Sequence, residues 1–310
     1  MTALRIGSRG SKLALWQAHF IRDEIARIHS LTAEIVIVKT SGDRFQQGGV
    51  GQIGLKGVFI KELEDALLAG EVDLAVHSMK DVPTETPAGL AFPAVYRRVD
   101  VRDCLIARDA RRFSDLPRGA RLGTSSLRRQ AQLRHIRPDL TVLELRGNVD
   151  TRLRKLEEGQ YDAIVLAKAG LDRLGWSDKI TDVFPTAQVL PAVGQGALGI
   201  ECRGEDARVA ELLRVLDHDE TRAGVTAERA LLARLEGGCQ VPLGAWGRIE
   251  GGRLWLDAVV LAADGSEHVR DIVAGAPEDS EALGRELAEK LLDAGAGRLL
   301  QLAGRTMHGS

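Results

Sequence analysis

The sequence predicts an α/β protein that ends in a small α+β domain. Strand-like and helix-like segments alternate over the first half of the chain, whereas the C-terminal part changes to consecutive strands flanked by helices. The length of 310 residues allows two or three domains with a sizeable core. Hydrophobic residues make up 44% and charged residues 28%, which is typical of an ordinary soluble globular protein and excludes a disordered or collagenous chain.

Hydrophobic spacing and β-branched runs predict the elements of the alternating part. Leu13, Trp16, Phe20 and Ile21 share one helical face, which predicts a helix over Lys12–Ile28. The same reasoning predicts helices over Val58–Ala69, Leu127–His135 and Val149–Glu158. The predicted strands are Leu4–Ile6, Glu34–Lys39, Val72–Val76, Leu90–Val95, Cys104–Ala107, Arg121–Gly123, Thr141–Leu145 and Ala163–Ala167. This alternation favours largely parallel sheets.

The C-terminal part predicts one antiparallel sheet with helices beside it. An amphipathic helix is predicted over Thr226–Leu235 and a final helix over Ser280–Asp293. The three strands between them are predicted at Val241–Ile249, Leu254–Leu261 and His268–Val273. Consecutive strands of this kind indicate a small α+β domain.

The segment Gly42–Gly57 is unlike the rest of the chain. It holds six glycines in sixteen residues and shows little periodicity. Because it is too long for an ordinary turn, it indicates either a mobile cover of an active site or an unstructured insertion, and composition favours neither.

Charge is distributed unevenly along the chain. The formal net charge of −2 gives no indication of a nucleic-acid partner. Between Arg97 and Arg154, however, fifteen Arg and no Lys stand against seven acids, a surplus of eight positive charges. A basic segment in an acidic protein indicates an anion site, with solvated surface arginine or a GC-rich genome as alternatives. Nucleic-acid binding would need aromatic stacking platforms, and this segment contains Phe113 alone.

Several function classes lack support in the sequence. Cys104, Cys202 and Cys239 lie far apart without a Cys-x-x-Cys motif, which predicts reduced thiols. The seven His show no metal-ligand spacing, so no metal is expected. There is no apolar run for a transmembrane helix and no apolar signal segment, so no membrane partner and a cytoplasmic location are expected. Glycine-rich nucleotide-binding motifs are also missing.

Two strand-to-helix junctions in the basic segment are candidate anion sites. Gly123–Arg129 places hydroxyl residues and then two arginines at a helix N-terminus, where free N–H groups favour an anion. Leu145–Arg152 places arginines on both sides of a Gly-Asn turn. Because open α/β sheets bind ligands at strand carboxyl ends, both junctions are expected to face one crevice. The alternative for the first is that Ser125 or Ser126 caps the helix beside surface arginines.

Two further segments carry reactive residue types. His77–Pro83 follows a strand and places Lys80 beside Asp81, a carboxylate that could offset a developing positive charge or move a proton. The heptapeptide alone favours the alternative, a turn with a capping Asp81. Gly237–Pro242 places Cys239 on a loop, as a nucleophile, an attachment point or simply a half-buried apolar thiol.

Seven segments resemble, in family order, the porphobilinogen deaminases (hydroxymethylbilane synthases). They are Arg5–Gln17, Lys56–Glu62, His77–Pro83, Gly123–Gln130, Leu145–Val149, Leu190–Arg203 and Gly237–Pro242. Each motif is weak alone, but seven in order over about residues 5–245 are highly specific. The family usually has proline where this chain has Lys12, and proline suits the first turn of a helix.

The resemblance implies three domains. Two resemble the halves of a type II periplasmic-binding-protein fold, and a small α+β C-terminal domain has an antiparallel sheet. The implied boundaries are 1–98 with 195–217 for the first domain, 99–194 for the second, which has an Arg-rich cleft, and 218–310 for the third, which carries the Cys239 loop. A monomer is expected.

The implied reaction is the head-to-tail condensation of four porphobilinogen molecules, with loss of ammonia, into linear hydroxymethylbilane for tetrapyrrole biosynthesis. The implied cofactor is a dipyrromethane joined to Cys239 by a thioether. Asp81 is implied as the catalytic residue that holds pyrrole N–H groups and offsets the cationic azafulvene left when the amine departs. Gly42–Gly57 would be a flexible cover.

The family match also implies two sets of binding residues. The cofactor set, besides Cys239, is Ser78, Lys80, Asp81, Ser126, Arg128, Arg129 and Arg146. The substrate set is Arg9, Ser11, Gln17, Phe59, Arg146, Arg152 and Arg173. Each porphobilinogen carries an acetate and a propionate, so burying the growing chain needs paired, hydrogen-bonding cations.

A solute-binding or effector-sensing module of the same two-domain fold remains the rival hypothesis. Its arginines would grip a dicarboxylate. It explains the basic segment, but it requires neither Asp81 beside Lys80, nor a loop Cys239, nor a third domain.

Overall fold

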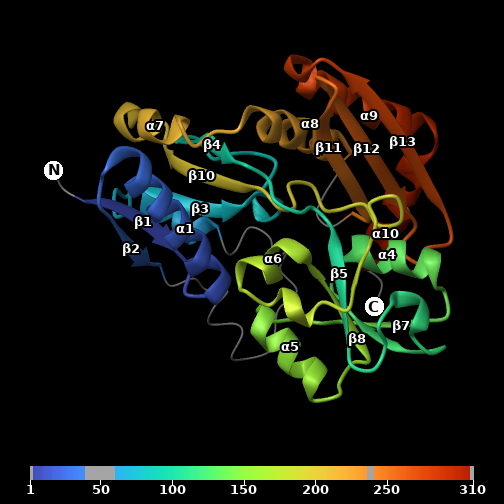
Figure 1. Cartoon of the computed structure of the whole chain (residues 1–310). Helices are drawn as coiled ribbons and strands as arrows, with labels where there is room; N and C mark the ends of the chain where they lie inside the picture. The colour runs from blue at the N-terminus through green and yellow to red at the C-terminus, as the bar shows by residue number, and fades with distance from the viewer. Residues whose placement is uncertain (1–2, 39–59, 236–240, 308–310) are drawn as a thin grey trace. The chain divides into compact units, whose positions relative to one another are not determined.

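The chain forms two compact units in the computed structural model, which describes residues 3–38, 60–235 and 241–307. The first unit comprises Met1–Val99 and Gly196–Arg222, and the second comprises Asp100–Gln195 and Ala223–Ser310 (Figure 1). The chain therefore leaves the first unit twice: it builds part of the second unit, returns to the first, and then leaves again to complete the second.

The first unit is a five-stranded sheet covered by helices on both faces. Its strand order is β2-β1-β3-β10-β4, in which β1 pairs in parallel with β2 and β3, and β10 runs antiparallel to β3 and β4. The strands are β1 (Leu4–Ser8), β2 (Ala33–Ile37), β3 (Leu74–Ser78), β4 (Leu90–Tyr96) and β10 (Leu198–Arg203). Helices α1 (Lys12–His29) and α7 (Ala207–Arg214) share one apolar cluster with the sheet, and α3 (Lys61–Leu68) contributes to another.

The second unit contains a sheet of the same design. Its order is β7-β6-β8-β5-β9, with β6 parallel to β7 and β8, and β5 antiparallel to β8. The strands are β5 (Asp103–Ala107), β6 (Arg121–Gly123), β7 (Thr141–Leu143), β8 (Ala163–Ala167) and β9 (Asp182–Val183). Its helices are α4 (Leu127–Ile136), α5 (Val149–Glu157) and α6 (Lys168–Arg173). In both sheets the antiparallel strand is the one that follows a crossing of the chain between the units.

A three-stranded antiparallel sheet completes the second unit. It consists of β11 (Leu243–Glu250), β12 (Arg253–Leu261) and β13 (His268–Gly275), with α8 (Asp219–Leu235), α9 (Ser280–Asp293) and α10 (Ala296–Met307) around it. Val259 and Leu261 of β12 share an apolar cluster with Ala131 of α4 and Leu190, which joins this sheet to the rest of the unit. None of the helices within the described ranges has the length and apolar content to cross a membrane.

The predicted fold class is confirmed, and several details differ from the prediction. The five-stranded sheets are not wholly parallel, because each accepts one antiparallel strand from the crossing chain. Strand β3 begins two residues later than predicted and includes His77 and Ser78. Helix α8 begins at Asp219 rather than Thr226. The elements that were not predicted are α6, α7, α10, β9 and β10.

The first turn of α1 has the geometry that suits the proline usually found in the family at the position of Lys12. Ser11 is extended (φ −72°, ψ 147°), and its side chain caps the helix by accepting the N–H of Ala14 at 3.3 Å. A residue that precedes proline must have an extended backbone, as Ser11 has. Proline has no N–H, and the N–H groups of the first helical turn have no acceptor within the helix, so proline would fit at position 12. We expect Lys12→Pro to raise the free energy of unfolding by about 0.4–1 kcal/mol in urea titrations, by restricting the unfolded chain.

Lys12→Ala is the control for this change, since it removes the same side chain without restricting the backbone. Lower stability in both variants would show that the lysine side chain itself stabilises the fold.

Candidate active site

The first unit gathers its predicted site residues at one edge of its sheet. Strands β1 and β3 are parallel neighbours, so their carboxyl ends lie together. β1 leads into Arg9 and Ser11, and β3 ends at Ser78. Gln17 Nε2 donates to Ser78 Oγ at 2.8 Å, which ties the two predicted segments together.

Lys80 and Asp81 lie on a 3-10 turn, Met79–Asp81, directly after β3. Met79 anchors this turn: its side chain is buried, and its N–H donates to the Ala197 carbonyl at 3.0 Å. A Cβ at residue 199 would lie 2.3 Å from the Met79 sulfur, so glycine there leaves room for the anchor. Lys80 is half-buried and Asp81 is exposed. The carboxylate is therefore presented to solvent from an anchored turn.

A buried His–Glu pair joins β3 to β10, and sequence reasoning missed it. His77 Nε2 on β3 lies 2.9 Å from Glu201 Oε2 on β10, and both side chains are almost completely buried. Burial and the nearby Glu201 charge raise the pKa of Glu64 on α3. In the sequence, Glu201 is noticeable only as one acid inside the apolar run Leu198–Cys202. That pattern does not reveal His77, which lies 124 residues away in the sequence.

The second unit brings both predicted junctions to one edge of its sheet. Ser125 Oγ donates to the Leu145 carbonyl at 2.8 Å and accepts the Leu145 N–H at 3.0 Å. Because β6 and β7 are parallel neighbours, the junctions lie side by side. Gly147 has φ +114°, and a Cβ there would lie 2.7 Å from Thr151, so this turn requires glycine.

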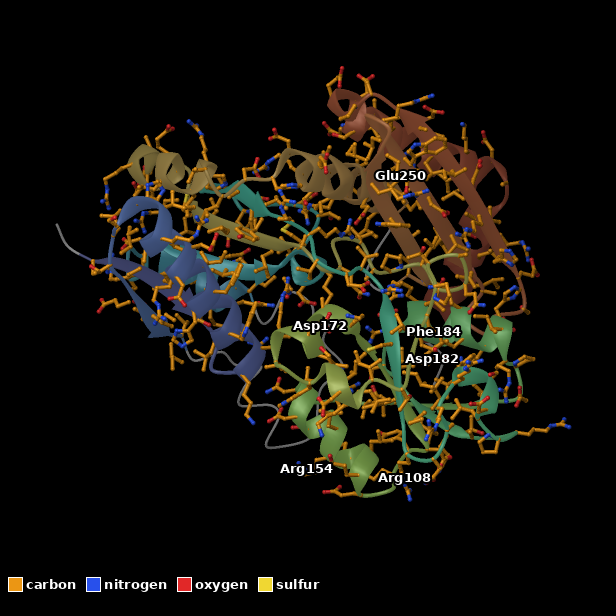
Figure 2. All side chains as sticks on the ribbon, viewed as in Figure 1. Arg108, Arg154, Asp172, Asp182, Phe184 and Glu250 are labelled. Carbon is orange, nitrogen blue, oxygen red and sulfur yellow. The ribbon has the colours of Figure 1, made fainter. Side chains whose placement is uncertain are left out.

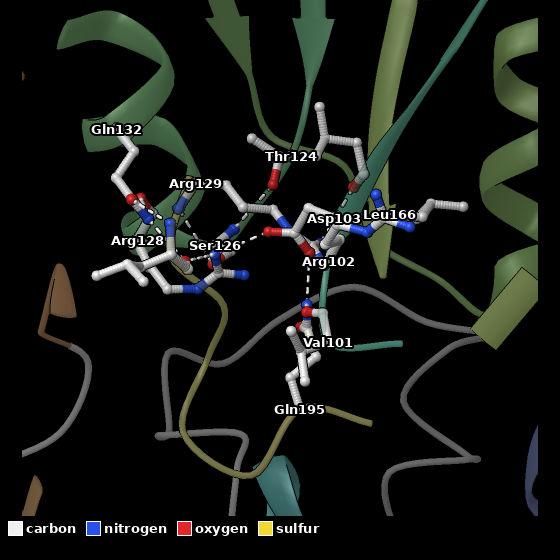
Figure 3. A network of polar contacts seen from close by, with 12 residues as sticks. Val101, Arg102, Asp103, Thr124, Ser126, Arg128, Arg129, Gln132, Leu166 and Gln195 are labelled. Atoms are coloured by element: carbon white, nitrogen blue, oxygen red, sulfur yellow. Dashed lines mark hydrogen bonds and ion pairs between the residues drawn. The ribbon is translucent and has the colours of Figure 1, made fainter. Parts of the chain in front are cut away.

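Arg128 and Arg129 are buried rather than surface residues. Ser126 does cap α4 by accepting the Arg129 N–H at 3.5 Å, as the alternative held, but the two arginines are only 5% and 6% exposed. Arg128 Nη1 lies 2.7 Å from Asp103 Oδ2, and Arg129 Nη2 lies 2.8 Å from Asp103 Oδ1 (Figure 3). Burial alone would raise the pKa of Asp103, but the two guanidinium charges outweigh burial and lower it.

The other predicted arginines have different surroundings. Arg146 is exposed and pairs with Glu144 at 2.6 Å. Arg152 is half-buried, and its Nε donates to the Gly147 carbonyl at 2.7 Å. Arg173 ends α6, which follows β8 at the same sheet edge, and burial lowers its pKa to about 10.

Part of the basic segment is ordinary surface. Arg108 and Arg154 are exposed, and Figure 2 shows both at the outside of their unit. The arginine surplus therefore divides into solvated residues and a buried group at the strand ends.

Comparison with known proteins identifies one family over nearly the whole chain, the family that the sequence motifs resemble. The family model "Porphobilinogen deaminase, dipyromethane cofactor binding domain" matches residues 4–211, and "Porphobilinogen deaminase, C-terminal domain" matches residues 223–293. The chain belongs to the porphobilinogen deaminase family. Porphobilinogen deaminases are transferases, and a dipyrromethane is their cofactor.

Individual relatives agree with the porphobilinogen deaminase assignment. The porphobilinogen deaminase of Desulforudis audaxviator is 55% identical over 296 residues, covering 95% of this chain and 96% of the relative. That of Trichlorobacter lovleyi is 51% identical over 299 residues, covering 96% of each chain. Among solved structures, the periplasmic VFT2 domain of Bordetella pertussis BvgS has a TM-score of 0.42 and 15% identity, covering 68% of this chain and 85% of that chain, a similarity too low to bear on function.

The buried arginine pair of the second unit suits the carboxylate-bearing cofactor of porphobilinogen deaminases. Two guanidinium groups share a single carboxylate, so the cluster keeps one surplus positive charge. The Nε atoms of Arg128 and Arg129 are buried donors with no partner among the described residues. Surplus charge and surplus donors suit an anionic ligand better than a closed ion pair.

Some predicted parts of the porphobilinogen deaminase site lie outside the described residues, namely Phe59, Cys239 and the segment Gly42–Gly57. The other two cysteines are poor attachment points. Burial raises the pKa of Cys104 to about 12 and that of Cys202 to about 11, so neither is a thiolate at neutral pH. The described part of the chain contains no cluster of three or more His, Cys, Asp or Glu that could hold a metal ion.

Proposed function

We propose that this chain condenses four porphobilinogen molecules head to tail, releasing ammonia each time, into linear hydroxymethylbilane for tetrapyrrole biosynthesis. The observation that carries the proposal is the buried arginine pair with its surplus charge, in a chain that matches the family over nearly its full length. A substrate with an acetate and a propionate on every ring needs such cations wherever it is buried.

Asp81 is the proposed catalytic residue. Its carboxylate is exposed on an anchored turn, so it can accept pyrrole N–H groups and offset the positive charge that develops when an amine leaves the substrate. Lys80, beside it, pairs with carboxylates of the cofactor. Arg9, Ser11 and Gln17, from the same sheet edge, bind substrate, and Ser78 contributes to the cofactor set.

The second unit supplies the other proposed binding residues. Ser126, Arg128, Arg129 and Arg146 hold carboxylates of the dipyrromethane, which is attached through Cys239. When bound, the dipyrromethane supplies the pyrrole carbon to which the first substrate is joined. Arg152 and Arg173, together with Arg146 and Phe59, hold substrate carboxylates and rings.

We also propose the three-domain division 1–98 with 195–217, 99–194 and 218–310. Support comes from the separate apolar cluster of the C-terminal sheet and from the two sheets of like strand order. The enzyme is proposed to work as a cytoplasmic monomer on a small-molecule substrate, without a nucleic-acid or membrane partner.

The intact mass of the purified, denatured protein tests the cofactor assignment. We expect the wild type to carry an excess mass of two linked pyrrole units, and Cys239→Ser to lack it together with all turnover. Cys202→Ser is the matched control and should keep the excess, because that thiol is buried. A wild type of bare polypeptide mass, made in cells supplied with porphobilinogen, would contradict the proposal and favour a solute-binding module.

A further inference from the structure

Asp103 occupies a central position that none of the assigned roles includes. It begins β5, is fully buried, and gives one carboxylate oxygen to each of two arginines that are adjacent in the sequence. Both arginines lie in the first turn of α4, where the helix dipole disfavours positive charge. Two buried like charges at that position require a shared anion, and Asp103 supplies it.

The Asp103 carboxylate is itself held in one orientation. Gln195 Nε2 donates to Asp103 Oδ1 at 2.9 Å and to the Val101 carbonyl at 2.7 Å (Figure 3). Oδ1 therefore accepts from Gln195 and Arg129, while Oδ2 accepts from Arg128. A rotation of the carboxylate would break contacts to both arginines at once.

The guanidinium groups are also fixed on their other sides. Arg128 Nη1 donates to the Leu190 carbonyl at 2.6 Å, and Arg129 Nη1 donates to the Val165 carbonyl at 3.1 Å. Gln132 holds Leu190 in turn: its Oε1 accepts the Leu190 N–H at 2.7 Å, and its Nε2 donates to the Leu190 carbonyl at 3.0 Å. Each arginine is thus held between Asp103 and a backbone carbonyl.

We propose that Asp103 is a positioning residue for ligand carboxylates: it holds Arg128 and Arg129 in one fixed pair, and Gln195 holds Asp103. The inference rests on the proposed role of the two arginines. Asp103 also sets the net charge of the pair at plus one. The two effects of Asp103 make opposite predictions for Asp103→Asn. If Asp103 only neutralised part of the arginine charge, removing its charge would strengthen anion binding. If Asp103 holds the guanidinium groups in position, the same change weakens anion binding.

Three holoenzyme variants test this inference: Asp103→Asn, Gln195→Met and Asp139→Asn. Gln195→Met removes the orienting amide and changes no charge. Asp139→Asn is the matched control, because Asp139 forms a partly exposed ion pair with Arg137 in the same unit. Steady-state assays give kcat and KM for porphobilinogen, and intact mass gives the fraction of protein that carries the two-pyrrole adduct.

We expect Asp103→Asn to raise KM at least about tenfold, as loss of a charge-assisted contact does, with kcat within about threefold of wild type. Gln195→Met should raise KM in the same direction, and both variants should carry less adduct. Asp139→Asn should match wild type. A purely structural defect would also lower the adduct-bearing fraction, but it would leave KM unchanged.

A lower KM in Asp103→Asn, or an unchanged KM and adduct fraction in Gln195→Met, would overturn the inference. If Asp103→Asn fails to fold, Gln195→Met decides alone, since it leaves the ion pairs intact. A wild type that carries no adduct would contradict the proposed function itself, and this result is distinct from those that would overturn the role of Asp103.

Discussion

Asp81→Asn is expected to lower kcat at least about a hundredfold, within the range for removing a catalytic carboxylate. Asparagine keeps the size of the side chain but carries no negative charge and accepts no proton. The loss should fall on kcat, because Asp81 acts where positive charge develops, while the arginines bind the carboxylates. The measurement is ammonia release at saturating porphobilinogen, from protein whose adduct has been verified by mass.

The fold should tolerate that change. Asp81 is exposed, and surface substitutions usually alter the free energy of unfolding by no more than about 0.5 kcal/mol. Glu85→Gln is the matched control, as it neutralises another exposed carboxylate four residues further along the chain. Near-normal turnover in Asp81→Asn, or an equal loss in Glu85→Gln, would refute the assigned role.

His77→Leu is expected to lower the free energy of unfolding by about 1–3 kcal/mol, the cost of leaving a buried hydrogen-bonding group without its partner. The change leaves Glu201 fully buried without its histidine, and the second carboxylate oxygen already has no partner among the described residues. Urea titrations of both proteins at pH 7 measure the difference. His19→Leu, an exposed histidine on α1, should have little effect.

The double variant His77→Leu with Glu201→Met separates pairing from packing. Replacing both partners with apolar side chains of similar size removes the buried carboxyl group as well as its partner, so the double variant should recover most of the lost stability. If the two single changes simply add, the residues are not energetically coupled. Because His77 lies two residues before the turn that carries Asp81, kcat of the double variant also reports how far the pair supports that turn.

Local pattern was sufficient for most of the elements that carry the site, although α6, which ends at Arg173, was not predicted. Strand β6 and helix α9 were predicted at their observed bounds. The two Arg-containing junctions, which were expected to face one crevice, lie at one sheet edge because parallel strands end together. Strand β10 was missed, since an apolar run that crosses to a sheet begun almost two hundred residues earlier has no local signature. Its identity as a strand depends on pairing with β3 and β4.

The arginine pair marks a second limit of sequence reasoning. Ser126 was correctly considered as a helix cap, and the two arginines after it were predicted to bind an anion, with solvated surface residues as the alternative. Neither interpretation included a buried carboxylate partner. The missing information was Asp103, one of seven acids in the basic segment and 25 residues before Arg128. No spacing rule distinguishes it from the other six.

The late arrival of β10 has a consequence for how the protein is made on the ribosome. Strand β4 is an edge strand whose sheet partner is β10, and all of residues 97–197 are synthesised between them. At about 5–20 residues per second, β3 and β4 wait roughly 5–20 s for the strand that lies between them. During that interval the nascent chain exposes unpaired strand edges, a state prone to intermolecular pairing. The first unit can therefore close only after part of the second has already been translated.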